Sequence, residues 1–199
     1  MKKQAGEENF DLAVSLNNLA KLQISKGNYE DAEALYLQAI EIREKVLGAE
    51  HPDMAIFLNN LALLYKSQGK LSEAEPLYVR SIMIREKVLG PEHPDLAKAL
   101  DNLARFYYVQ GKYEEAEPLC RRALEIREKF LGPEHPDTAT FLNNLALLYK
   151  SQGKFDEAEP LLTRALEISR KELGAKHPAT TTYLSNLANL YDAKIKNAD

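Results

Sequence analysis

Four histidines are the side chains in this chain most able to bind a metal, and they recur at a fixed interval of 42 residues. They are His51, His93, His135 and His177. Neighbouring helices pack about 8–10 Å apart, so equivalent atoms in successive two-helix repeats should lie about 20 Å apart. Zinc binds its ligands at about 2 Å, so no two of these histidines can share an ion. We therefore expect each histidine to cap or pack its loop, and we expect no metal and no cofactor.

Acidic clusters and a single thiol are the remaining candidates for catalysis. The clusters at 114–117 and 157–159 begin helical stretches, where the helix dipole favours carboxylates, so we interpret them as solvated helix starts. Cys120 takes a position that is tyrosine or leucine in the other repeats, which predicts a core residue. The sequence has no glycine-rich phosphate loop and no serine–histidine–aspartate pattern. It predicts no enzymatic activity.

The composition excludes several classes of partner. The chain has 199 residues, a formal net charge of −4 and one cysteine. A negative net charge is a poor match for nucleic acid. No stretch reaches the roughly 18 apolar residues of a membrane span, and the charged N-terminus does not read as a secretory signal. We expect a soluble, cytoplasmic protein that binds neither nucleic acid nor membrane.

The interval of 42 residues extends well beyond the histidines. Glycine recurs at it from Gly27 to Gly153, and asparagine recurs from Asn18 to Asn186. Self-similarity at a fixed period of this length is typical of a solenoid, in which each repeat packs only against its neighbours. Such proteins present a long surface to a partner, so the repeat bears on function as well as fold.

Each repeat reads as two helices of unequal length. Residues 58–65 carry apolar side chains at i, i+3, i+4 and i+7, Gly69 ends this helix, and Pro94 starts the next first helix. Residues 6–11 align with the later loops and predict a loop. We expect one solenoid over 1–199 with four helix pairs and a terminal capping helix. The expected units are 11–52, 53–94, 95–136 and 137–178, followed by a capping helix at 179–195. First helices are expected near 11–26, 53–68, 95–110, 137–152 and 179–195, and second helices near 29–47, 71–89, 113–131 and 155–173.

The repeated residues resemble the tetratricopeptide repeat. The resemblance rests on small and apolar positions, which are Leu16, Leu19, Ala20, Ala32, Tyr36 and Ala39 with their equivalents at the 42-residue interval. Two of them depart from the usual pattern, since many such repeats have tryptophan in place of Leu16 and glycine in place of Ala20. Units reading LNNLALLYKSQGK…EAEPLY…IREKVLGPEHPD are similar to the 42-residue kinesin light chain type. Residues 57–70 and 141–154 are identical, and bacterial arrays are the closer likeness. The heptad coiled coil that joins kinesin light chains to the motor has no counterpart here.

This resemblance implies an all-α, right-handed α-α superhelix whose first helices line a concave groove that binds proteins or peptides. Charge is segregated between the two sets of helices. Residues 12–26, 54–68, 96–110 and 138–152 hold six basic side chains and one acid, whereas the second helices hold 18 acids and 12 bases. A basic groove wall on an acidic protein predicts an acidic ligand.

The residues expected in the groove lie opposite the apolar stripe of the first helices. The resemblance implies that their asparagines hold the backbone of an extended peptide. An alternative is that these amides form a ladder between adjacent helices and need no ligand. The third repeat departs most from the others at these groove positions, which indicates either specificity for a ligand or neutral drift of the sequence. The candidate peptide-binding residues are Asn18, Asn59, Asn60, Leu63, Lys66, Lys98, Asn102, Arg105, Tyr108, Asn143, Asn144, Leu147 and Lys150.

The sequence therefore predicts a protein–protein interaction scaffold that binds an extended, acidic peptide segment. The alternative is a structural module that self-assembles through its ends, or spaces other domains of a larger signalling protein. A third reading is a consensus-like array without a natural ligand. We expect a monomer, or a weak homo-oligomer formed through the array ends.

Overall fold

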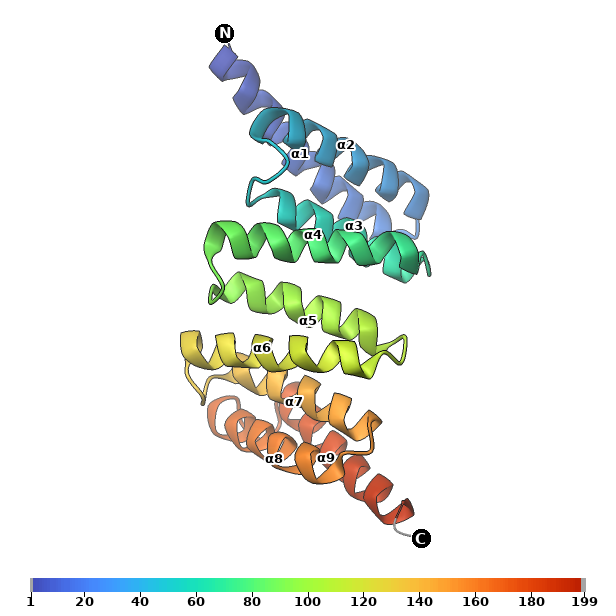
Figure 1. Ribbon diagram of the computed structural model, residues 1–199, viewed down its shortest axis with the longest axis vertical. Coiled ribbons are helices and arrows are strands. Elements are labelled where there is room, and N and C mark those ends of the chain that lie inside the picture. Colours follow the sequence, from blue (N-terminus) through green and yellow to red (C-terminus); the bar gives the residue numbers. More distant parts are fainter. Residues whose placement is uncertain (1, 198–199) are drawn as a thin grey trace. The chain divides into compact units, whose positions relative to one another are not determined.

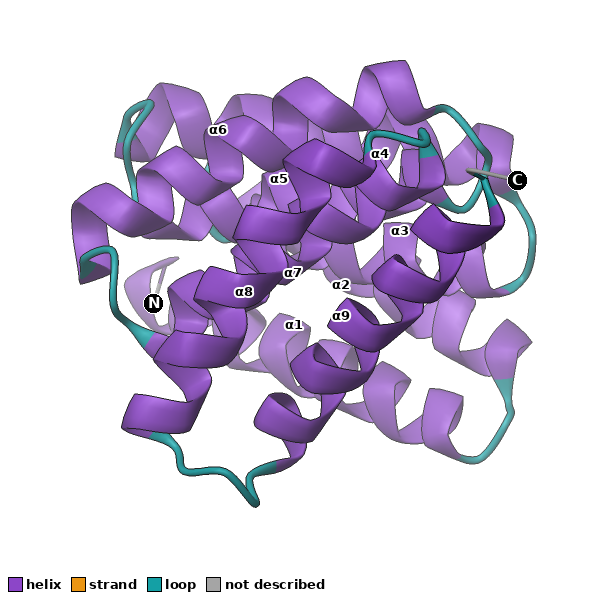
Figure 2. Ribbon diagram, turned by 90° about the horizontal axis from the view of Figure 1, so that it is seen from below, coloured by secondary structure: helices purple, strands orange, loops and turns teal. Residues whose placement is uncertain are grey.

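The computed structural model describes residues 2–197, with side chains described from residue 11, and all regular structure in that range is helical. The predicted all-α fold of helix pairs is confirmed (Figure 1). Loops connect successive helices (Figure 2). The helices are α1 (Lys2–Ser25), α2 (Tyr29–Leu47), α3 (Met54–Ser67), α4 (Leu71–Leu89), α5 (Pro94–Tyr108), α6 (Tyr113–Leu131), α7 (Pro136–Ser151), α8 (Phe155–Glu172) and α9 (Pro178–Lys196).

The helices fall into two compact units, Met1–Glu92 with α1–α4 and His93–Asp199 with α5–α9. In the first unit α1 packs on α2 and α3 on α4, and α2 also packs against α3. In the second unit α5 packs on α6 and α7 on α8, while α6 also contacts α7 and α8 contacts α9. A second helix such as α2 or α6 is therefore held between the first helix of its own pair and the first helix of the next.

Helix ends follow the turn residues that the sequence repeats. Gly69 has φ of +74°, a left-handed conformation that costs glycine little. The Lys70 N–H then donates to the Tyr65 carbonyl at 2.9 Å, which closes the end of α3. At the opposite end, the Nδ1 atoms of His93 and His135 accept the backbone N–H groups two residues on, at 3.2 and 3.1 Å. The prediction that these histidines cap their helices is confirmed.

The start of α1 differs from the prediction. Residues 6–11 were expected to form a loop, but they belong to α1, which runs from Lys2 to Ser25. The later loop at 90–95 contains two prolines and a capping histidine, whereas residues 6–11 contain one glycine and no proline. Glycine costs a helix about 1 kcal/mol relative to alanine, and proline costs about 3 kcal/mol. A single glycine is therefore too weak to end the helix.

Small residues where the helices meet let them approach closely. Ala20 and Ala62 are fully buried. Ala20 belongs to a cluster in the first unit with Tyr36, Leu61 and Leu64. An alanine side chain has no rotamers to fix, so it fills this position without entropic cost. Alanine at this position, where many tetratricopeptide repeats have glycine, is accommodated in the core.

Buried arginines from the second helices complete the packing. Arg43 lies 5.2 Å from the ring centroid of Phe57, and Arg127 lies 5.2 Å from that of Phe141. Arg43 also pairs with Asp53, with Nη1 3.2 Å from Oδ2. A guanidinium over a ring keeps a favourable electrostatic contact after it loses water. This contact joins α2 to α3 and α6 to α7.

Candidate functional site

The first helices turn one side to solvent, as the periodicity predicts. On α3, Leu58 and Leu61 are buried, whereas Ile56 and Leu63 are 45% and 41% exposed. An exposed face with leucine and isoleucine differs from the charged exterior typical of a solvated helix. We call the side of the first helices that bears the candidate residues the first-helix face. In the first unit it carries Asn18, Asn59, Asn60, Leu63 and Lys66, and in the second unit Lys98, Asn102, Arg105, Tyr108, Asn143, Asn144, Leu147 and Lys150.

Amide groups connect neighbouring first helices within each unit. Asn60 Nδ2 donates to Asn17 Oδ1 at 2.9 Å, which joins α3 to α1. In the second unit Asn144 Nδ2 donates to Asp101 Oδ1 at 2.9 Å, which joins α7 to α5. The ladder of amides proposed as the alternative reading is therefore present. An amide nitrogen has two hydrogens and the oxygen accepts, so Asn60 and Asn144 keep further hydrogen-bonding capacity.

The ladder continues to α9 and includes hydroxyl groups. Asn186 Nδ2 donates to Asn143 Oδ1 at 2.7 Å. Asn143 is only 7% exposed, so it serves mainly to connect the two helices. The Tyr108 hydroxyl lies 2.9 Å from Ser151 Oγ, which places this candidate tyrosine against α7. These contacts fix the spacing of α5, α7 and α9.

Three cations on the first-helix face of the second unit are without an ion pair among the described residues, as is Arg170 on the second helix α8. Among residues 11–197, Lys98, Arg105 and Lys150 take part in no ion pair. By contrast, Lys154 lies 2.8 Å from a Glu117 oxygen, and Arg164 on α8 lies 2.6 Å from a Glu128 oxygen. Lys98 and Arg105 are exposed on α5, and Lys150 is half-buried on α7. The paired cations stabilise the array, whereas these three keep charge that a ligand can use.

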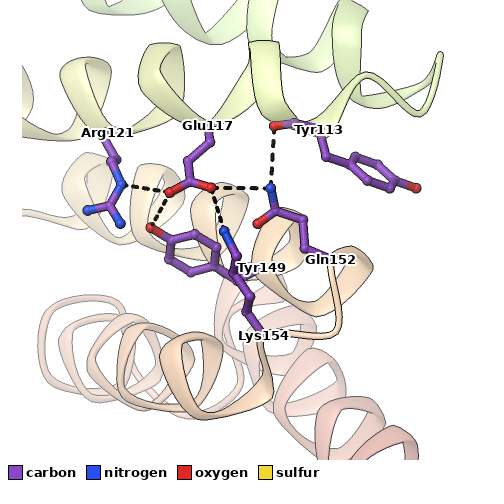
Figure 3. A network of polar contacts seen from close by, with 6 residues as sticks. All are labelled: Tyr113, Glu117, Arg121, Tyr149, Gln152 and Lys154. Carbon is purple, nitrogen blue, oxygen red and sulfur yellow. Dashed lines mark hydrogen bonds and ion pairs between the residues drawn. The ribbon is translucent and has the colours of Figure 1, made fainter.

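A glutamate between repeats forms a network that was not anticipated from the sequence (Figure 3). Glu117 Oε2 accepts from Lys154 Nζ at 2.8 Å and from Gln152 Nε2 at 3.2 Å. Its Oε1 accepts from Arg121 Nε at 3.1 Å and from the Tyr149 hydroxyl at 3.3 Å. The hydrogen bond from Lys154, with those from Gln152 and Arg121, lowers the pKa of Glu117 to about 2, against the effect of burial. The expected solvated helix start is therefore wrong for Glu117.

The same arrangement occurs at other junctions. Glu33 Oε1 accepts from the Tyr65 hydroxyl at 3.0 Å, and its Oε2 accepts from Lys70 at 2.7 Å. Glu159 accepts from the Tyr191 hydroxyl at 2.9 Å. We call this contact the glutamate clamp. In it, a glutamate of one second helix accepts from a tyrosine of the next first helix and from a lysine at or near the end of that helix. The clamp glutamate and the clamp tyrosine both recur at the 42-residue interval, so the periodicity of the sequence could have indicated this contact.

The remaining chemistry-bearing groups lie outside any cluster. Cys120 is buried, and burial raises the pKa of its thiol to about 12, which agrees with the predicted core role. No group of three or more potential metal-ligating side chains occurs among the residues that the structure describes. Over the same part of the chain, every helix is too short or too polar to cross a bilayer.

Comparison with known proteins adds the family. A tetratricopeptide repeat model matches residues 11–87, 53–108, 95–171 and 137–197. The crystal structure of a putative kinesin light chain with nearly identical TPR-like repeats from Podosopora anserina is 31% identical, covering 94% of this chain and 89% of that one, with a TM-score of 0.82. The crystal structure of BtubC (BKLC) from P. vanneervenii is 28% identical, covering 94% and 74%, with a TM-score of 0.83. No curated protein matches the chain.

Proposed function

The chain belongs to the tetratricopeptide repeat family, whose members are generally non-catalytic protein-interaction scaffolds, and we propose that it binds an extended, acidic segment of a partner protein on its first-helix face. One match to the family model, at residues 53–108, spans the boundary between the two compact units. This supports the proposal that the repeats form one array. The free thiol of Cys120 agrees with a reducing, cytoplasmic location.

The cations without partners carry this proposal. Lys98 and Arg105 lie seven residues apart on α5, so they share one side of the helix. Neither forms an ion pair within residues 11–197, and the same holds for Lys150 on α7. A cation without a protein partner attracts an anionic ligand and loses no existing ion pair when it binds. Acidic side chains spaced along an extended peptide match this arrangement.

The amide and apolar groups on the same face support a peptide as the ligand. Asn144 uses one amide hydrogen in the ladder, and its remaining hydrogen and its oxygen suit the N–H and C=O groups of a peptide backbone. The ladder also orients this amide, so less side-chain entropy is lost on binding. Leu147, half-buried on α7, offers an apolar contact. Asn102, on α5 one residue after Asp101, belongs to the same proposed surface.

A library of acidic peptides, read out by fluorescence anisotropy, tests the proposal. We expect binders whose affinity falls as salt rises, because exposed charge pairs are screened. A double variant with Lys98→Glu and Arg105→Glu reverses the charge at both positions and should weaken binding by about tenfold. Each exposed ion pair between the protein and an acidic peptide side chain contributes about 0.2–1 kcal/mol and becomes repulsive in this variant. Asn102→Ala should also weaken binding.

Arg170→Glu is the matched control. Arg170 is exposed on the second helix α8 and forms no ion pair among the described residues, so the charge change is the same away from the first-helix face. It should leave affinity within about twofold, the size of effect expected of a remote surface charge. Equal losses in both variants would show that only net charge matters. No binding by any acidic peptide would refute the proposal.

A further inference from the structure

The first helix α5 carries three charges in one stripe of the first-helix face. Lys98, Asp101 and Arg105 are spaced by three and four residues, so they are neighbours along one side of the helix. Lys98 and Arg105 are exposed, and Asp101 is half-buried, whereas its equivalents Asn17 and Asn143 are only 5% and 7% exposed. We call these three residues the α5 charge stripe. The proposed function uses its two cations and gives no role to the carboxylate between them.

The three charges occur together in a single repeat. Asp101 is the sole acid among residues 12–26, 54–68, 96–110 and 138–152. The equivalent positions are uncharged in the repeats before and after, and they are Ile56, Asn59 and Leu63 on α3 and Thr140, Asn143 and Leu147 on α7. The α5 charge stripe is therefore a feature of the third repeat alone, the repeat that departs most from the others.

The amide ladder does not require a carboxylate at this position. Asp101 Oδ1 accepts from Asn144 Nδ2 at 2.9 Å. At the equivalent position on α7, the amide oxygen of Asn143 accepts from Asn186 at 2.7 Å, and the amide oxygen of Asn17 accepts in the same way on α1. An asparagine offers the same acceptor as an aspartate. The negative charge of Asp101 is thus additional to what the ladder needs.

The two cations of the stripe do not pair with the carboxylate between them. Their spacings from Asp101 would allow an ion pair along the helix. Within residues 11–197, however, Lys98 and Arg105 take part in no ion pair. Neutral drift balanced by a new ion pair on α5 would have joined Asp101 to one of them. The arrangement instead favours a ligand that meets all three charges.

We propose that Asp101 determines specificity on the first-helix face, and that the bound segment has a basic residue between two acidic ones. This inference rests on the proposed function and deepens it. The acidic side chains pair with Lys98 and Arg105, and the basic side chain donates to Asp101, since a carboxylate only accepts hydrogen bonds. A run of acidic residues without a basic one is disfavoured, because its central carboxylate meets a like charge.

The dimensions of the stripe suit this pattern. Lys98 and Arg105 are seven residues apart, which is about 10 Å along a helix. An extended peptide rises about 3.3 Å per residue, so it covers this distance in about three residues. There is room for one or two residues between the two acidic ones.

A substitution scan of an acidic peptide tests the inference. Each position of a peptide that binds the full chain is replaced in turn by lysine and by glutamate, and affinity is measured by fluorescence anisotropy. We expect one position at which lysine binds about fivefold more tightly than glutamate, flanked by positions where glutamate is the better residue. In Asp101→Asn the preference for lysine should disappear or reverse, because Lys98 and Arg105 remain.

Asp101→Asn also distinguishes this role from a purely structural one. The variant keeps the acceptor for Asn144, so thermal unfolding followed by circular dichroism should be unchanged. Glu125→Gln is the matched control. It removes one carboxylate that is exposed on α6 and forms no ion pair among the described residues, so the change in net charge is the same. It should keep the preference for lysine.

The possible results separate this inference from the proposed function. Acidic peptides that bind but show no position preferring lysine would overturn the inference and leave the proposed function standing. So would a preference that survives in Asp101→Asn, or one that Glu125→Gln also removes. Binding by no acidic peptide would refute the proposed function and this inference with it.

Discussion

The Nζ atom of Lys154 lies 2.8 Å from Oε2 of Glu117, and this contact joins the residue before α8 to the second turn of α6. The pair shares its junction with Tyr149 and Gln152, both of which also donate to Glu117. A second helix is thus attached to the following repeat by charge as well as by apolar packing. Since repeats contact only their neighbours, the stability of such a junction limits the stability of the array.

Removing the clamp carboxylate should destabilise the second unit. Glu117→Ala leaves four donors without their acceptor, and we expect a loss of about 1–3 kcal/mol in the free energy of unfolding. Urea denaturation followed by circular dichroism measures it. Glu114→Ala, at an exposed position on the same helix, should change stability by less than about 0.5 kcal/mol. Equal effects of the two substitutions would show that the clamp contributes nothing specific.

The clamp should also make stability depend on pH in a defined direction. Folding lowers the pKa of Glu117 from an ordinary value of 4.5 to about 2. Because the folded state holds the carboxylate more strongly deprotonated, the contribution is complete above pH 4.5 and is lost as the pH falls towards 2. The stability difference between the native chain and Glu117→Gln should therefore shrink over that interval. A difference that stays constant between pH 6 and pH 2.5 would contradict this.

The amide ladder should show coupling between the helices that it joins. In a double-mutant cycle of Asn17→Ala and Asn60→Ala, we expect a coupling energy of about 0.5–1.5 kcal/mol in the free energy of unfolding. Asn18→Ala should be nearly neutral for stability, because Asn18 is exposed. Additive effects of Asn17→Ala and Asn60→Ala would mean that their hydrogen bond does not stabilise the junction.

The thiol of Cys120 should be inert in the folded protein. Burial holds its pKa near 12, so thiolate is scarce at pH 8 and access is blocked. Labelling with a thiol reagent should be slow in buffer and fast in denaturing urea. Rapid labelling without denaturant would show that α6 opens locally or that the thiol is exposed.

Much of the fold could be predicted from the sequence because the repeat supplies several independent versions of each position. The glycine at 69 and the histidines before the prolines marked helix ends correctly, since their effect on the backbone is local. The prediction of a loop at residues 6–11 was wrong, because the alignment of this segment with the later loops ignored its missing prolines. What ends a helix is the side chain present, not the phase of the repeat.

The site was less predictable than the fold. Helical periodicity correctly placed Leu63 on an exposed face. It could not show that Asn60 would reach Asn17, because that contact depends on the distance between helices of different pairs. The clamp was missed for the same reason, since Glu117 and Lys154 are 37 residues apart and meet only after the junction has packed. Which cations remain unpaired likewise depends on tertiary contacts.

We propose that Lys98 and Arg105 attract an acidic peptide to the first-helix face. The most direct measurement is the salt dependence of peptide affinity for the native chain, for Lys98→Glu with Arg105→Glu, and for Arg170→Glu. We expect affinity to fall with salt in the native chain and in Arg170→Glu, and we expect the double variant to lose most of the affinity and most of the salt dependence. Binding that is independent of salt, or retained in the double variant, would contradict it.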